Sequence, residues 1–374
     1  MLLVFDVGIG KIDLNSDRVA LAGIANVIQA YRNGFHFLLG SRATLESLLS
    51  CELLGELDTA ALKTILSRYS ELGALKSTDL ATITFVAEGT SFIRTGSRSF
   101  QMTIQAVAIK PLLSTALLAE NTLDSILYGF AGEHYRIHEN VKLGCLSLTH
   151  QSGGGSQIAT ILRSQLNDKE RPVVCITDGD RWHVDEPDSP MSRACSDEAM
   201  NCAWPCEHLA LKERELENVI PSSLIAEAIA LEQREAFDEL DALRQATGWE
   251  AYAFADLKEG TRLHKLLESG QSSSRRVFWL KAAMFQSSSG RMDDGCVSSQ
   301  RCREDVGIQC AAEGCRITKA IGQRVSEAVE RHVKAMSLHE SWRRAKTSHN
   351  LDAWLALGKV VFEWCASPAA RMRL

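Results

Sequence analysis

Two aspartates follow directly after an apolar run near the middle of the chain. The segment PVVCITDGD (172–180) predicts a buried strand that ends at Asp178, with Asp180 two residues further on. In an extended chain these two carboxylates would point the same way. Two ionised carboxylates about 5 Å apart repel each other by roughly 3 kcal/mol at an effective dielectric of about 20. Mg²⁺ or Mn²⁺, which prefer oxygen ligands, would relieve that repulsion. The pattern therefore predicts a divalent-metal site where this strand ends.

A third carboxylate, Glu120, ends another predicted strand. The segments that connect the two strands alternate between strand and helix with short connections. In order they are a strand at 115–120, a helix at 122–135, a strand at 142–148, a glycine loop at 150–156, a helix at 157–166 and a strand at 172–178. Such a βαβαβ order is typical of a parallel sheet with crossover helices. Ligands of open parallel sheets bind beyond the carboxyl ends of the strands, so we expect Glu120 to join Asp178 and Asp180 there.

These segments resemble the TOPRIM domain of topoisomerases, bacterial primases, small ribonuclease-maturation enzymes and overcoming-lysogenization-defect nucleases. The likeness rests on a strand ending in Glu120, a loop containing Gly153–Gly155 and a strand ending in Asp178-Gly-Asp180. It covers about 115–221 and implies a TOPRIM-like parallel Rossmannoid sheet within an α/β protein.

The sequence adds one feature to this likeness and departs from it in another. The stretch ERELENVIP (213–221) is similar to one that follows the core in the defence-associated nucleases, and it would add Glu217 to the site. The family glutamate is usually followed by glycine, where this chain has Asn121. Glu88, which is followed by glycine but whose flanks predict a hairpin, therefore stays open as a rival to Glu120.

The resemblance implies a metal-dependent nuclease. Asp178 and Asp180 would hold Mg²⁺ or Mn²⁺, and Glu120 would be a second ligand or a general acid/base in the hydrolysis of DNA or RNA. It also implies a role in antiphage defence and a partner ATPase. Two alternatives stay open. One is a non-catalytic sensor or adaptor whose acidic site is vestigial and whose cysteine-rich C-terminal part binds nucleic acid or a protein partner. The other is a Rossmann-like domain whose two aspartates cap the next helix.

Two groups of cysteines are candidates for a structural zinc site, although neither has a Cys-x2-Cys pair, and ordinary buried or surface thiols are the alternative. The first group is Cys296, Cys302, Cys310 and Cys315. The second group is Cys195, Cys202, Cys206 and His208. Basic residues that could contact phosphates, unless they are solvated helix ends, are Arg275, Arg276, Arg343, Arg344 and Lys346.

Composition and charge limit which partners the whole chain can bind and where in the cell we expect it. The 374 residues carry a net charge of −6, so binding to nucleic acid requires a local basic face. The segment 296–374, with 13 Lys/Arg against 8 Asp/Glu, is one candidate. The absence of a basic leader and of long apolar runs predicts a cytoplasmic protein without membrane spans and with reduced thiols, which could form homo-oligomers.

Four regions are expected from these patterns. They are an N-terminal α/β scaffold or docking domain (1–110), a TOPRIM-like catalytic domain (111–221), a helical region (222–290) and a cysteine-rich, basic helical C-terminal region (291–374). In the first region, a strand ending near Asp6 before a helix is similar to the start of PIN-type ribonucleases, but the further acids of that fold are not placed by the sequence.

Overall fold

The computed structural model describes residues 1–266, 273–292, 294–299 and 315–368, and the chain divides into two compact units. Unit 1 comprises Met1–Ile176, Ala194–Leu209 and Leu355–Leu374, and unit 2 comprises Thr177–Arg193 and Ala210–Trp354. The predicted boundary at residue 110 falls inside unit 1. Among the helices of the described residues, none combines the length and apolar character needed to cross a bilayer.

Unit 1 contains a five-stranded sheet built from the N-terminal residues. Its strands are β1 (Leu2–Phe5), β2 (Phe37–Gly40), β3 (Thr82–Val86), β4 (Phe92–Arg94) and β5 (Ser99–Thr103), in the order β2-β1-β3-β5-β4. All pairings are parallel except that of β4 with β5. The helices that accompany these strands are α1 (Arg18–Arg32), α2 (Arg42–Leu49), α3 (Glu56–Ser67) and α4 (Tyr69–Gly73). The side chain of Asp17 caps α1 by accepting the Ala20 N–H at 2.8 Å.

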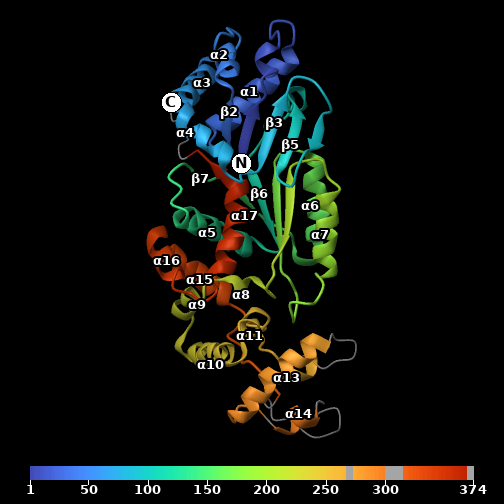
Figure 1. Cartoon of the computed structure of the whole chain (residues 1–374), viewed down its shortest axis with the longest axis vertical. Helices are drawn as coiled ribbons and strands as arrows, with labels where there is room; N and C mark the ends of the chain where they lie inside the picture. Colours follow the sequence, from blue (N-terminus) through green and yellow to red (C-terminus); the bar gives the residue numbers. More distant parts are fainter. Residues whose placement is uncertain (267–272, 293, 300–314, 369–374) are drawn as a thin grey trace. The chain divides into compact units, whose positions relative to one another are not determined.

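A second sheet in unit 1 carries the predicted βαβαβ order. Its strands are β6 (Thr115–Ala119), β8 (Leu148–Ser152), β9 (Val173–Thr177) and β10 (Cys206–Ala210), in the order β10-β9-β6-β8. The helices α5 (Thr122–His138), α6 (Ile158–Asp168) and α7 (Pro190–Met200) accompany them (Figure 1). β6 pairs in parallel with both β8 and β9, and every residue of β9 is buried. The general α/β class with a parallel-rich sheet is confirmed, whereas the TOPRIM assignment stays a prediction.

Two strands differ from the sequence prediction. The strand expected at 142–148 is instead β8, which includes His150–Ser152, residues predicted to be in the glycine loop. Residues Cys145–Leu146 form β7, which pairs with β11 (Ala366–Ser367). β8 and β10 are the edge strands of their sheet, where one side is less enclosed and polar residues are tolerated. Their sequences LTHQS and CEHLA therefore lack the apolar run by which β6 and β9 are recognised.

The C-terminal helix α17 (Leu351–Cys365) reaches the core of unit 1. It packs closely on α5. A Cβ atom added at Gly358 would lie only 2.2 Å from the carbonyl oxygen of Ala131, so this contact requires glycine. After the helix, the carbonyl oxygen of Ala366 accepts a hydrogen bond from the Met1 ammonium group. The end of the described chain is thus held against both its beginning and α5.

Unit 2 is mainly helical, as the sequence predicts for much of 209–268. Its helices are α8 (Leu216–Val219), α9 (Ser222–Ala228), α10 (Leu231–Thr247), α11 (Glu250–Ala253), α12 (Leu263–Leu266), α13 (Ser273–Ser288), α14 (Asp294–Ser299), α15 (Val325–Lys334) and α16 (Leu338–Ala345). The buried amide of Asn350 donates to the carbonyl oxygens of Asn218, Val219 and Ile220 and accepts the Ser222 N–H at 2.9 Å. One side chain thereby fixes the backbone that runs from α8 into α9.

Candidate acidic site

The Asp178-Gly179-Asp180 turn is fixed against the loop that precedes α8. Asp178 Oδ1 accepts the Leu216 N–H at 3.1 Å, and the Asp180 N–H donates to the Arg214 carbonyl oxygen at 2.8 Å. A Cβ atom at Gly179 would lie 2.1 Å from the carbonyl oxygen of Glu213, so this close approach requires glycine. The sequence predicted the aspartates here, but not the loop that holds them.

The extended geometry expected for 178–180 is wrong. Asp180 has a φ of +52°, in the left-handed region that non-glycine residues seldom adopt. The chain turns there because the Asp180 N–H is bonded to Arg214 and Gly179 packs directly on the loop. The exposed Asp180 lines a cavity of about 710 Å³, together with Asp185, Arg193 and Arg275.

Two buried glutamates share one lysine beside Asp178. Glu217 is 3% exposed; its Oε1 accepts the Ser326 hydroxyl at 2.6 Å and its Oε2 lies 3.1 Å from Lys258 Nζ. Glu215 Oε2 lies 3.2 Å from the same Nζ atom. Glu217 was predicted from the ERELENVIP stretch, whereas Lys258 was not, because a lone lysine some 40 residues further along gives no motif.

The electrostatics of this cluster leave an excess of negative charge. Burial raises the pKa of Glu215, although Lys258 and Arg214 act against that rise. Burial also disfavours the charged form of Lys258, but the carboxylates of Glu217, Glu215 and Asp178 outweigh it and raise the pKa of the ammonium group. Arg214 lies 3.2 Å from Glu215 and 3.8 Å from Asp256. With all groups ionised, the four carboxylates and two cations have a formal charge of −2, which a divalent cation would neutralise.

Glu120 follows β6 and belongs to unit 1, whereas Asp178, Asp180 and Glu217 belong to unit 2. The expected meeting of Glu120 with the aspartates therefore stays a prediction. The structure does give a reason for Asn121, where the TOPRIM family usually has glycine. Its side chain caps α5 by accepting the Asp124 N–H at 3.0 Å.

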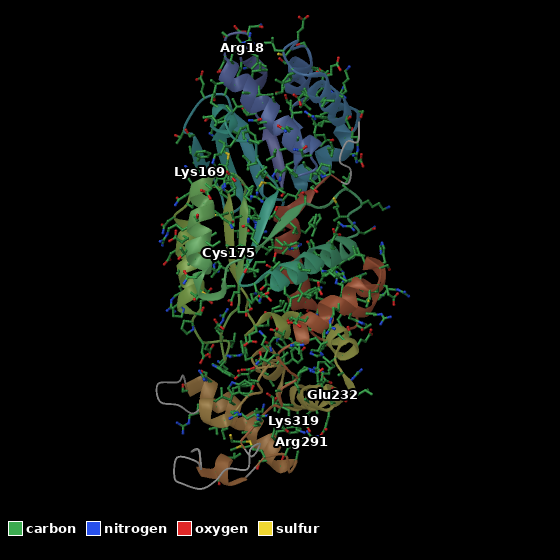
Figure 2. The ribbon with its side chains drawn as sticks, turned by 180° about the vertical axis from the view of Figure 1, so that it is seen from behind. Arg18, Lys169, Cys175, Glu232, Arg291 and Lys319 are labelled. Carbon is green, nitrogen blue, oxygen red and sulfur yellow. The ribbon has the colours of Figure 1, made fainter. Side chains whose placement is uncertain are left out.

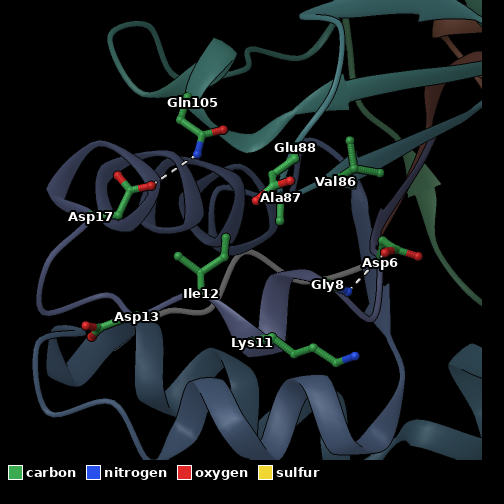
Figure 3. Close-up of a pocket in the computed structure, with 10 residues that line it drawn as sticks. All are labelled: Asp6, Gly8, Lys11, Ile12, Asp13, Asp17, Val86, Ala87, Glu88 and Gln105. Carbon is green, nitrogen blue, oxygen red and sulfur yellow. Dashed lines mark hydrogen bonds between the residues drawn. The ribbon is translucent and has the colours of Figure 1, made fainter.

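The rival Glu88 lies in the other sheet of unit 1. It follows β3 and lines a cavity of about 670 Å³ together with Asp6, Lys11, Asp13 and other residues (Figure 3). Asp6 Oδ1 accepts the Gly8 N–H at 3.0 Å. Because β3 and β9 belong to different sheets, Glu88 does not end a strand of the β9 sheet, and Glu120 fits the motif better. A scaffold or docking role for the N-terminal region stays a prediction.

The predicted phosphate contacts lie in different surroundings. Arg275 is 6% exposed, pairs with Glu186 at 3.0 Å and lies over the Trp182 ring, while Arg276 is exposed. Arg343 and Arg344 are in α16 and both pair with Glu340, and Lys346 follows that helix and is exposed. Arg275 is thus a packed, ion-paired residue, and the exposed cations are better placed to meet a phosphate.

A cysteine and histidine cluster in unit 1 could hold a metal ion. The ligand atoms of Cys175, Cys195 and His208 all lie within 4.8 Å of one another. Cys175 donates a hydrogen bond to Cys195, which raises the pKa of Cys175 and lowers that of Cys195. A carboxylate, Glu120, also interacts electrostatically with both thiols.

The structure describes the two predicted zinc-binding groups to different extents. The second group divides, because Cys195 and His208 join Cys175, while Cys202 interacts with Cys206, whose thiol donates to the Ala199 carbonyl oxygen at 3.3 Å. Sequence reasoning missed Cys175, which looks like one more apolar residue of a core strand. Of the first group, the side chains of Cys296, Cys302 and Cys310 lie outside the described residues, and Cys315 is half-buried.

Comparisons with protein-family models, curated proteins and solved structures found no match to this chain. The assignment of a function therefore depends on the residues themselves.

Proposed function

We propose that the protein is a metal-dependent nuclease that hydrolyses phosphodiester bonds of DNA or RNA through a TOPRIM-like acidic site. The observation that supports this most is the acidic cluster at the end of β9. Asp178 lies where a buried parallel strand ends, is oriented by the Leu216 N–H, and neighbours a group of charges with a negative excess. Such an arrangement suits Mg²⁺ or Mn²⁺.

Each residue has a distinct role in this proposal. Asp178 and Asp180 hold the cation, which would polarise a phosphodiester and activate water when bound. Glu217 is nearly inaccessible, so its role is to hold Lys258 and the loop in place. The Lys258 side chain is 31% exposed, so its ammonium group can meet a phosphate oxygen. Glu120 enters from the sequence motif, as a second ligand or general acid/base.

The wider setting rests on the TOPRIM resemblance. It includes antiphage defence and a partner ATPase. The cytoplasmic location, a homo-oligomer and nucleic-acid contacts through exposed cations such as Arg276 and Lys346 belong to the proposal on the patterns of the sequence instead.

The test is cleavage of plasmid DNA and structured RNA in the presence of Mg²⁺, Mn²⁺ or EDTA. We expect cutting by the wild-type chain with either metal and none with EDTA. Asp178→Asn keeps an oxygen that can accept the Leu216 N–H but removes the charge, and it should lower the rate by about 100-fold or more. The control is Asp238→Asn, at an exposed position of α10 in the same unit and away from the cavity that Asp180 lines, which should cut like the wild type.

Two results would overturn the nuclease proposal. One is cutting that persists unchanged in Asp178→Asn, which would indicate a contaminant or another site. The other is tight binding of nucleic acid without cutting, unchanged in the same variant, which would support the sensor or adaptor alternative.

A further inference from the structure

The Cys175, Cys195 and His208 cluster joins three elements of unit 1 that are separate in the sequence. Cys175 is the middle residue of β9, Cys195 lies in α7, and His208 is the middle residue of β10. β10 is the sheet neighbour of β9, and the Val173 N–H donates to the Pro205 carbonyl oxygen. The Leu211 N–H donates to the Thr177 carbonyl oxygen, and the two bonds together fit a parallel ladder that sets His208 beside Cys175 with both side chains on one face.

The helix α7 brings the third side chain to that face. It lies beside α6 in Figure 1, and Arg163 of α6 pairs with Glu198 of α7, with Nε and Oε1 3.0 Å apart. The side chains of Cys175 and Cys195 are fully buried, whereas His208 is half-buried. Both thiols are therefore enclosed, and His208 is the one partly accessible member of the cluster.

We propose that Cys175, Cys195 and His208 bind one Zn²⁺ ion in unit 1, separate from the magnesium or manganese of the acidic site. Thiolates and imidazole are the ligands that Zn²⁺ prefers in proteins. With Zn–S near 2.3 Å and Zn–N near 2.1 Å, neighbouring ligand atoms of a tetrahedron are about 3.7 Å apart. Since the three ligand atoms already lie within 4.8 Å of one another, movements of about 1 Å or less would form the site.

The burial of the cluster and its charge also favour Zn²⁺. Two thiolates neutralise the charge of Zn²⁺, so the bound site has no net charge to bury beside the core of the sheet. Figure 2 labels Cys175 within that sheet. The fourth position is left to water or another oxygen ligand on the side of His208. Bound zinc would cross-link β9, α7 and β10, and so attach the segment that contains α7 to the sheet.

The experiment strips the purified full chain with a chelator and titrates it with Co²⁺ and then Zn²⁺. The wild type should show the thiolate-to-cobalt charge-transfer band and the intense visible bands of tetrahedral cobalt, and Zn²⁺ should abolish both. His208→Ala and Cys195→Ser should each bind one equivalent less, so cobalt held by other cysteines cancels in the difference. Cys202→Ser is the matched control, since Cys202 pairs with Cys206 and not with the cluster, and it should bind like the wild type.

A second readout separates binding from folding. Zn²⁺ should raise the melting temperature of the wild type and of Cys202→Ser more than that of His208→Ala, because only intact sites gain binding energy in the folded state. His208 is partly accessible, so His208→Ala decides the matter if Cys195→Ser does not fold. The proposal is overturned if the wild type gives no thiolate band, or if folded His208→Ala takes up as much cobalt as the wild type.

Discussion

Removal of the Lys258 ammonium group should destabilise unit 2, because it leaves two buried carboxylates without their shared cation. At an effective dielectric of about 20, a charge pair 3.1 Å apart has a Coulomb energy of about 5 kcal/mol. Burial of the ammonium group offsets part of this gain, and its 31% exposure limits it further. We expect Lys258→Met to lower the free energy of unfolding by about 3 kcal/mol at neutral pH, near the lower end for breaking a buried pair.

The loss should depend on pH in a defined direction. Burial already raises the pKa of Glu215, and loss of the ammonium group raises it further. The unfolded pKa of a glutamate is about 4.3. If its folded pKa is higher, the group costs no stability below about pH 4.3, and the cost grows as the pH rises from that value through the folded pKa. The difference between wild type and Lys258→Met should therefore be small near pH 4.5 and largest near pH 8.

The assay is urea unfolding followed by tryptophan fluorescence at several pH values. Lys258→Arg keeps the charge and should lose less stability, and Lys212→Met, at an exposed lysine of the same unit, should stay close to the wild type. In a double-mutant cycle, Glu217→Gln should remove much of the cost of Lys258→Met. A loss below about 0.5 kcal/mol without pH dependence would refute the view that Lys258 neutralises this cluster.

Three further predictions concern the backbone of the site and of unit 1. Asp180→Gly relieves the left-handed conformation, so it should raise the unfolding free energy by up to about 1 kcal/mol while abolishing metal-dependent cutting; a destabilised variant would contradict the first part. Gly358→Ala should cost about 3 kcal/mol in thermal or urea unfolding, because its Cβ meets α5 at 2.2 Å, whereas Gly73→Ala, with open space around it, should cost nothing measurable. Asn121→Ala should cost about 1 kcal/mol through loss of the α5 cap, and Asn121→Ser, which keeps a capping oxygen without placing a second carboxylate against Asp124, should restore part of it; equal losses would argue against capping.

In the sheet that contains β9, the central strands were predictable from the sequence, and the edge strands were not. β6 and β9 are buried on both faces, so their sequences TALLA and VVCIT are continuous apolar runs. β8 and β10 lie at the sheet edges and carry polar residues, so their pattern resembles that of loops. The packing of α17 against α5 depends on a contact between distant segments, which no local pattern encodes.

A similar distinction holds for the candidate sites: residues at the end of a recognisable strand were predictable, and residues that only the folded chain brings together were not. Asp178 was predictable because it ends a buried strand, and the turn at Asp180 was not, because it depends on the Arg214 carbonyl oxygen across a loop. Lys258 and Cys175 have no sequence signal of their own. Lys258 matters only because folding brings it to Glu217, and Cys175 only because β10 and α7 bring His208 and Cys195 to it.

The most direct test of the acidic metal site is the binding of Mn²⁺ itself. Electron paramagnetic resonance of free Mn²⁺ can count the ions taken up by the zinc-loaded wild type, Asp178→Asn and the control Asp238→Asn. The nuclease proposal predicts at least one ion bound by the wild type and by Asp238→Asn, and one fewer by Asp178→Asn. Equal uptake by all three proteins would contradict a divalent-metal site at Asp178.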